Sequence, residues 1–324
     1  MANRFTFAML PPHNETTRDW SRRLAADVPE ANVVLAEDEA EAEQAITTAE
    51  AAFGWLPEGL LAKATRLKWL QAPQAAPAAG YYHDALIRHD VAVTNFREIF
   101  NDHISAHILS YVLAFARGLP MYMRQQMRRE WIKPSEDQGV VHLPEATALI
   151  VGLGGIGTET ARLLSCFGVT VLATDARRTE TPAHVAEMHK PEALDALLPR
   201  ADFVILTVPH TPATEGFFNR SKFQRMKRSA FFINIGRGKT TRLDDLVAAL
   251  QAGDIAGAAL DVYEQEPLPA EHPLWELQNV ILTPHMAGYG PYLNERRYEI
   301  IRDNCRAFAA GRALRNMVDK ANWF

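Results

Sequence analysis

Short runs of apolar and β-branched residues alternate with longer amphipathic stretches along this chain. In the first part of the sequence the short runs predict strands at Phe5–Leu10, Val33–Leu35, Leu67–Gln71 and Val91–Thr94, with helices at Thr16–Asp27 and Glu37–Ala51. Parallel neighbouring strands need a long crossover, usually a helix, so this alternation is typical of a parallel α/β sheet.

The alternation is clearer in the middle of the chain. Six further strands are predicted at Ala148–Val151, Thr170–Thr174, Phe203–Thr207, Phe231–Ile235, Gly257–Leu260 and Val280–Thr283. Two long amphipathic stretches, Asp102–Arg117 and Pro291–Ala310, bracket this block and would carry the chain into and out of a second domain. We therefore expect a discontinuous first domain, residues 1–101 with 292–324, and an inserted domain, residues 102–291.

Composition supports two domains and narrows the class of protein. The 324 residues are about twice an ordinary domain, and 48% of them are hydrophobic, enough for a full core. A net charge of -5 gives no basic stripe for nucleic acid. The longest apolar stretch, Ile104–Ala116, is too short and polar to span a bilayer, and the first residues lack a secretory signal. With only Cys166 and Cys305, far apart, the chain is expected to be cytoplasmic.

A glycine loop gives the strongest chemical signal. A predicted buried strand runs into Gly152-x-Gly154-x-x-Gly157 and directly on into a helix. The first glycine permits a tight turn, the second lets the backbone approach a pyrophosphate, and the third lets the helix pack on its strand. This pattern predicts a dinucleotide site in the domain of residues 102–291.

An acidic residue at the end of the next strand indicates which dinucleotide binds. Asp175 follows Gly157 by 18 residues, close to the ~20 expected for the acid that accepts the adenosine ribose hydroxyls of NAD. Arg177 and Arg178 come immediately after it and could offset the repulsion of a 2′-phosphate. NAD is the expected cofactor, and NADP stays possible.

Three polar residues at successive strand ends could carry out hydride transfer to or from a hydroxy acid. His285, in ILTPHMAG, can act as the acid/base, and Glu266, in LDVYEQEP, can orient its ring and favour its protonated form. Arg237, between two glycines in FFINIGRG, can clamp a carboxylate. Each residue alone could equally be an ordinary loop residue, but their joint occurrence favours an oxidoreductase.

The same motifs resemble those of the D-isomer-specific 2-hydroxyacid dehydrogenases, which include glyoxylate and hydroxypyruvate reductases. The resemblance is tight from Leu143 to Gly288 and covers VGLGGIG, TVPHTPAT, INIGRG, AGAALDVYEQEPLP and LTPHMAG in order. It implies two doubly wound parallel-sheet domains, Rossmann- and flavodoxin-like, with the active site in the cleft between them. It also implies a homodimer that associates through the cofactor domain.

The resemblance assigns further residues to the cofactor and the substrate. It implies cofactor contacts at Gly155, Ile156, Val208, Pro209, Thr214, Ile235, Gly236 and Asp261, beside the glycines and Asp175. By the same resemblance, Arg237 binds the substrate, His285 is the acid/base and Glu266 is the carboxylate partner of His285. An ungapped reading sets Gln74, Ala75 and Ala76 at the loop that receives the substrate carboxylate, although LQAPQAAPAAGYYHDAL departs from the family's pattern.

Two features of the long helix region leave alternatives open. Arg97, in TNFREIFNDHI, could contact a second anionic group of a dicarboxylate or phosphorylated substrate, or could be an exposed, salt-bridged arginine. His103 and His107 have helical i, i+4 spacing but lack a third metal ligand, so we expect no metal site.

These patterns favour an enzyme that interconverts a small 2-keto acid and its D-2-hydroxy acid. The alternative from another class is an NAD-sensing corepressor-like scaffold with little turnover, which would be expected to carry extra tails or partner grooves. A formate dehydrogenase is disfavoured by Glu266, because formate oxidation needs no proton removal by a His–Glu pair. No nucleic-acid or membrane partner is expected.

Overall fold

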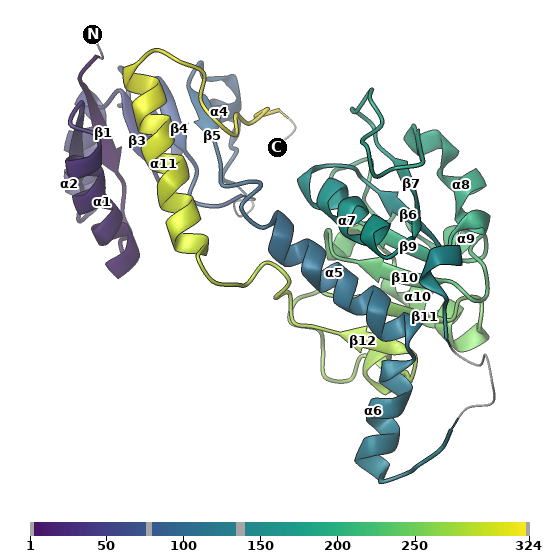
Figure 1. The fold of residues 1–324 in the computed structure, drawn as a ribbon. Helices are drawn as coiled ribbons and strands as arrows, with labels where there is room; N and C mark the ends of the chain where they lie inside the picture. Colours follow the sequence, from purple (N-terminus) through teal and green to yellow (C-terminus); the bar gives the residue numbers. More distant parts are fainter. Residues whose placement is uncertain (1–2, 76–79, 134–139, 322–324) are drawn as a thin grey trace. The chain divides into compact units, whose positions relative to one another are not determined.

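The computed structural model describes residues 3–75, 80–133 and 140–321. The chain divides into two compact units: unit 1 comprises Met1–Ile99 and Pro291–Phe324, and unit 2 comprises Phe100–Gly290 (Figure 1). Each unit is an α/β layer structure built on its own parallel sheet. The predicted fold class, two doubly wound parallel-sheet domains, is confirmed.

Unit 1 is built on a five-stranded parallel sheet with the order β2-β1-β3-β4-β5. Its strands are β1 (Phe5–Met9), β2 (Ala31–Leu35), β3 (Ala51–Phe53), β4 (Trp69–Gln71) and β5 (Ala92–Thr94). Its helices are α1 (Glu15–Asp27), α2 (Glu39–Thr48), α3 (Glu58–Leu61), α4 (Asp84–Arg88) and α11 (Leu293–Ala309). The strand order is that of flavodoxin-like sheets.

Alternate side chains of this sheet serve two different cores, as the period of a strand requires. On one face Ala8, Leu70 and Val93 pack with apolar residues of α2, α3 and α4. On the other face Trp69 packs against Phe7 and against Phe308 of α11, at ring-centroid distances of 5.4 and 5.7 Å. Helices therefore cover both faces of the sheet, and α1 and α11 lie on the same one (Figure 1).

Unit 2 is built on a seven-stranded parallel sheet with the order β12-β11-β10-β9-β6-β7-β8. Its strands are β6 (Thr147–Val151), β7 (Thr170–Thr174), β8 (Glu187–His189), β9 (Phe203–Leu206), β10 (Phe231–Asn234), β11 (Gly257–Leu260) and β12 (Val280–Leu282). Its helices are α5 (Asn101–Ala116), α6 (Leu119–Arg128), α7 (Gly155–Cys166), α8 (Leu194–Leu197), α9 (Arg220–Phe223) and α10 (Leu243–Ala252).

The strand order of unit 2 reverses between β6 and β9. Strands β7 and β8 extend the sheet to one side of β6, and β9 to β12 extend it to the other, which is the Rossmann arrangement with one added strand. Crossovers on opposite sides of β6 leave space above the carboxyl ends of β6 and β9. Ligands of open α/β sheets bind at such a switch point.

Several elements differ from the sequence-based expectation. The helix predicted over Glu37–Ala51 ends at Thr48, and Ala51–Phe53 forms the buried strand β3. Neither the edge strand β8 nor the helix α6 was predicted. None of the residues of α6 is buried, and the helix projects from the body of unit 2 (Figure 1).

Candidate functional site

The glycine loop follows β6 at the switch point of the unit 2 sheet. Gly152 has a left-handed φ of +98°, and a Cβ at Gly157 would lie 2.2 Å from the Gly152 carbonyl oxygen. Helix α7 begins at Gly155, and its N-cap residue Gly154 offers no side chain to the amides of the first turn. Among the described residues no side chain caps these amides, so they can receive an anion, and the glycines permit the close approach that a pyrophosphate requires.

The carboxylate of Asp175 is bound by backbone amides on both of its oxygens. Oδ2 accepts from Leu153 N at 2.7 Å, and Oδ1 accepts from Arg177 N at 2.9 Å and from Arg178 N at 2.7 Å. Burial acts to raise the pKa of Asp175, but the three amides together lower it. Asp175 therefore ties the glycine loop to the start of the next loop.

Lys190 adds a third positive side chain near Arg177 and Arg178, and the sequence-based prediction did not include it. Lys190 Nζ donates to Ala176 O and to Arg178 O, at 3.2 Å each. The signal for it in the sequence is weak, because β8, which ends one residue earlier, is a three-residue edge strand. The loop that follows Asp175 thus carries two positive residues and is bonded to a third, Lys190.

Loops at the ends of β6, β9 and β10 approach one another closely. A Cβ at Gly152 would lie 2.8 Å from Val208 Cγ1, and a Cβ at Gly236 would lie 2.6 Å from Val208 O. Thr214 closes the loop after β9 by donating from Oγ1 to Pro209 O at 2.7 Å. Val208 is only partly exposed and Ile235 is buried at this edge. The cofactor residues expected on these loops therefore lie around the switch point.

Arg237 is presented on a loop that buried side chains hold in place. Asn234, fully buried at the end of β10, accepts from Gly236 N at 3.0 Å and donates to Arg237 O at 3.2 Å. Gly238 packs on the backbone of Tyr263, where a Cβ would lie 1.8 Å from the carbonyl oxygen. The Arg237 side chain itself is exposed. Although part of Arg237 reaches solvent, the protein atoms around its guanidinium desolvate it and lower its pKa, and the Glu266 carboxylate opposes this.

His285 and Glu266 form a direct pair. His285 Nδ1 lies 2.7 Å from Glu266 Oε2, and Tyr263 N donates to Glu266 Oε1 at 2.9 Å. An ionised carboxylate only accepts, so Nδ1 carries the proton in this pair and Nε2 remains for a ligand. The His285 side chain is 50% exposed, which leaves Nε2 accessible. His285 has a left-handed φ of +51°, uncommon for a residue with a side chain.

Asp261, expected near the cofactor, lies beneath the His285 loop and is 1% exposed. Its Oδ1 accepts from Met286 N at 2.8 Å and its Oδ2 from Ala287 N at 2.9 Å. Among the described residues Oδ2 accepts from Ala287 N alone, so one of its acceptor positions remains for another donor.

Two of the residues expected to contact substrate, Ala75 and Arg97, lie in unit 1, after the carboxyl ends of β4 and β5. Asn95, 1% exposed, donates to Ala75 O at 2.9 Å and accepts from Arg97 N at 3.0 Å, so it joins the two loops. Arg97 Nε is buried and has no hydrogen-bond partner among the described residues. Ala76 lies outside the described residues.

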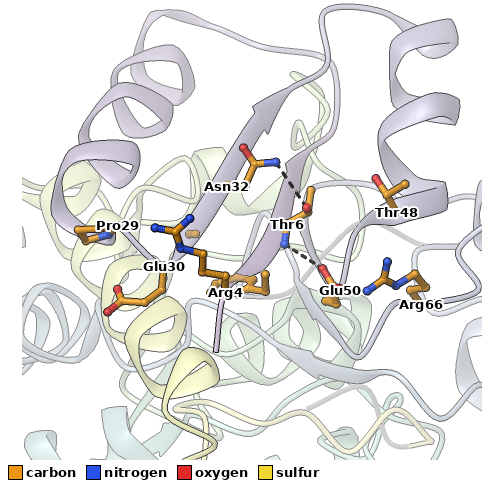
Figure 2. A pocket seen from close by; sticks show the side chains of 10 residues that line it. Arg4, Thr6, Pro29, Glu30, Asn32, Thr48, Glu50 and Arg66 are labelled. Atoms are coloured by element: carbon orange, nitrogen blue, oxygen red, sulfur yellow. Dashed lines mark hydrogen bonds and ion pairs between the residues drawn. The ribbon is translucent and has the colours of Figure 1, made fainter. Parts of the chain in front are cut away.

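The hollow in Figure 2 lies at the opposite end of the same sheet. It is lined by the first residues of β1 and β2 and by polar side chains that include Arg4, Glu30, Glu50 and Arg66. Glu50 accepts from Thr6 N at 2.8 Å and pairs with Arg66. Amino ends of parallel strands are not where α/β sheets bind ligands, so this hollow is not the candidate site.

Metal ligands and membrane spans were also sought among the described residues. There, no group of three or more His, Cys, Asp or Glu side chains could hold a metal ion. In the same part of the chain no single helix could cross a membrane by length and composition. The pair α5 and α6, bent by 69°, passes that test together.

Comparison with known proteins places the chain in a family. The model of the D-isomer-specific 2-hydroxyacid dehydrogenase NAD-binding domain matches residues 109–287. A glyoxylate reductase of Thermofilum pendens is 35% identical over 233 residues, which is 71% of this chain and 68% of that protein.

Two solved structures share the fold over nearly the whole chain. A family member from Xanthobacter autotrophicus Py2, in complex with NADPH and MES, has a TM-score of 0.83 and 29% identity, over 99% of this chain and 100% of that one. An NADPH-dependent glyoxylate/hydroxypyruvate reductase from Sinorhizobium meliloti, with NADP and sulfate, has a TM-score of 0.79 and 26% identity over the same shares. The chain belongs to the D-isomer-specific 2-hydroxyacid dehydrogenases, a family of NAD(P)-dependent oxidoreductases.

Proposed function

We propose that the protein interconverts a small 2-keto acid and the corresponding D-2-hydroxy acid by hydride transfer. The observation that carries this proposal is the pairing of His285 Nδ1 with Glu266 Oε2 at 2.7 Å, beside the exposed Arg237. The pair leaves Nε2 of an oriented imidazole free for proton transfer, which is the group that a carbonyl reduction needs.

The residues of unit 2 have separate roles in this reaction. Arg237 binds the substrate carboxylate through its planar fork and polarises the carbonyl. The nicotinamide, when bound, supplies or accepts the hydride. His285 donates the Nε2 proton to the carbonyl oxygen during reduction and takes it from the hydroxyl during oxidation. Glu266 holds the ring in the required tautomer and stabilises its protonated form.

The cofactor is proposed to lie along the switch point of unit 2. Its pyrophosphate would receive the free amides of Gly155 and Ile156, and the loops of Val208–Thr214 and Ile235–Gly236 would flank its nicotinamide half. Three amides bind Asp175, and the following loop carries Arg177 and Arg178 and is bonded to Lys190. This arrangement supports use of NADP as well as NAD, because the cations can neutralise a 2′-phosphate.

Unit 1 is proposed to bind the substrate. Its loop at Ala75 would offer backbone amides to the carboxylate. Arg97, with a buried Nε that lacks a partner among the described residues, is placed by Asn95 next to that loop. We propose that it contacts a second anionic group on the substrate.

The test is turnover with a panel of glyoxylate, hydroxypyruvate, pyruvate and dicarboxylic keto acids, each with NADH and with NADPH. The expected result is loss of reduced cofactor with at least one keto acid. No loss across the panel, together with tight cofactor binding, would instead favour the scaffold. No formate oxidation is expected.

The second copy in the proposed homodimer would cover α6. Large apolar side chains of α6 and of the segment after it are exposed, among them Met123 by 64%, Met127 by 85%, Trp131 by 89% and Ile132 by 58%. Exposed apolar patches of this kind mark interaction surfaces. Sedimentation should give a dimer that Met127→Glu weakens, and a wild-type monomer would contradict the proposal.

The free thiols Cys166 and Cys305 are consistent with the proposed cytoplasmic location.

A further inference from the structure

A chain of four polar side chains lies beneath the loop that carries His285. We call Asp261, Thr283, Tyr111 and His107 the Asp261 cluster. Thr283 Oγ1 donates to Asp261 Oδ1 at 2.5 Å, and Tyr111 OH lies 2.5 Å from Thr283 Oγ1. His107 Nε2 lies 2.8 Å from Tyr111 OH and 3.2 Å from Thr283 Oγ1. Helix α5 thus contacts the ends of β11 and β12 through polar side chains.

The order of protons along the cluster follows from its donors and acceptors. The Asp261 carboxylate only accepts, so the single proton of the Thr283 hydroxyl is committed to it. The Thr283 oxygen must then accept, and Tyr111 OH is the nearest donor. Tyr111 in turn accepts from His107 Nε2. Burial raises the pKa of Tyr111 and lowers that of His107, so both stay neutral donors.

The carboxylate at the end of this chain fixes the backbone next to His285. Met286 N and Ala287 N both donate to Asp261, at 2.8 and 2.9 Å. The residue just before them, His285, has its left-handed φ of +51°. A non-glycine residue keeps such a conformation only where its surroundings hold it, and it directs the imidazole toward Glu266.

We propose that Thr283, Tyr111 and His107 are positioning residues for His285, acting through Asp261. His107 orients the Tyr111 hydroxyl, which in turn orients the Thr283 hydroxyl. The Thr283 hydroxyl then fixes the Asp261 carboxylate, which holds the His285 loop. The effect on turnover rests on the proposed function, whereas the effect on the loop does not. This cluster gives α5 a direct influence on the acid/base.

The experiment compares Thr283→Val, Thr283→Ser and Tyr111→Phe in the full chain. Thr160→Val is the matched control, since Thr160 is 1% exposed in the same unit and donates to Ser105 Oγ, away from the cluster. The two measurements are amide hydrogen exchange at Met286 and Ala287, and kcat and KM for the best keto acid.

Thr283→Val should speed exchange at both amides and lower kcat by about tenfold, because a buried acceptor loses its donor. The KM should change less than twofold, because Arg237 is untouched. Thr283→Ser should restore both values. Tyr111→Phe should have a smaller effect of about threefold, since His107 Nε2 can then donate to Thr283 over 3.2 Å.

Two results would overturn the proposal: unchanged exchange in both Thr283→Val and Tyr111→Phe, or equal changes in Thr160→Val. If Thr283→Val does not fold, Tyr111→Phe still decides by the same measurements. A wild-type protein without turnover would count against the proposed function alone, because exchange at the two amides still tests the cluster.

Discussion

The pair formed by His285 and Glu266 joins the proposed proton-transferring imidazole to a carboxylate that the backbone holds in place. Glu266 Oε2 receives Nδ1 of the ring, while its Oε1 accepts from Tyr263 N. One carboxylate therefore both fixes the tautomer of the imidazole and is itself fixed by the backbone. A group held in this way needs little reorganisation when it transfers a proton.

Replacing His285 by Gln should lower kcat by about 10²–10⁴-fold, the usual contribution of a positioned acid/base. The amide keeps the size and polarity of the ring but cannot exchange a proton at neutral pH. NADH affinity, followed by its fluorescence, should stay within about twofold of wild type. His184→Gln, at an exposed position on the same unit, is the control. Wild-type turnover in His285→Gln would remove this residue from the mechanism.

Replacing Arg97 by Ala should raise the KM for substrates with two anionic groups and leave the KM for substrates with one unchanged. A charge-assisted hydrogen bond contributes about 1.5–3 kcal/mol, so the KM for a dicarboxylic keto acid should rise about 10- to 100-fold. The KM for glyoxylate should not change. Arg88→Ala, at an exposed position on α4 of the same unit, is the control. Equal changes for both substrates would assign Arg97 to the fold rather than to specificity.

At the scale of elements, two glycines at the start of α7, Gly154 and Gly157, have different roles. Gly154 has open space around its Cβ position, whereas a Cβ at Gly157 would lie 2.2 Å from Gly152 O. Gly154 leaves room for a ligand, and Gly157 leaves room for the end of β6. The sequence motif predicts both positions and both roles, and the Cβ distance at Gly157 agrees with the packing role.

Gly157→Ala should therefore lower the free energy of unfolding, by about 1–3 kcal/mol as for other overpacked sites. Gly154→Ala should leave stability unchanged, because its φ of −71° suits any residue. It should weaken cofactor binding instead, because a methyl group would stand where the pyrophosphate approaches. Thermal unfolding and NADH titration measure the two effects. Loss of stability in Gly154→Ala alone would reverse the assignment.

The sequence predicted most strands, because these are strongly apolar runs, and the three catalytic candidates stand on the loops that follow three of them. It missed β3, since Ala51–Phe53 follows an alanine- and glutamate-rich helix without a break in composition. It missed α6, whose apolar residues are exposed rather than directed to a core. It missed Lys190 and the Asp261 cluster, because their contacts join residues far apart in the chain.

At the scale of the whole molecule, each unit carries one cysteine in a different setting. Cys166 is exposed on α7 of unit 2, and Cys305 is buried on α11 of unit 1. The thiolate is the reactive form, and burial raises the pKa of Cys305. One thiol should therefore react quickly with a maleimide and the other only after unit 1 opens in denaturant. Mass spectrometry of the labelled peptides checks this, and rapid labelling of Cys305 in the folded protein would contradict it.

The buried phenols make the stability of the protein sensitive to alkaline pH. Burial raises the pKa of Tyr81, Tyr111 and Tyr263, and that of Tyr82 to about 12. In the unfolded chain these groups lose their protons near pH 10, about where free tyrosine titrates. The folded state holds the protons longer, so the stability present below that pH is lost as the pH rises toward 12 and above.

Tyr82 offers a direct test of this pH dependence, because its hydroxyl is buried without a hydrogen-bond partner among the described residues. Tyr82→Phe removes an unsatisfied polar group, so it should leave stability at pH 7 unchanged or raised. It also removes one proton from the alkaline transition, so the decline of Tm between about pH 10 and 12 should become shallower. Thermal unfolding across this range measures both effects. An equally steep decline in Tyr82→Phe would mean that the Tyr82 phenol ionises in the folded protein as readily as in the unfolded chain.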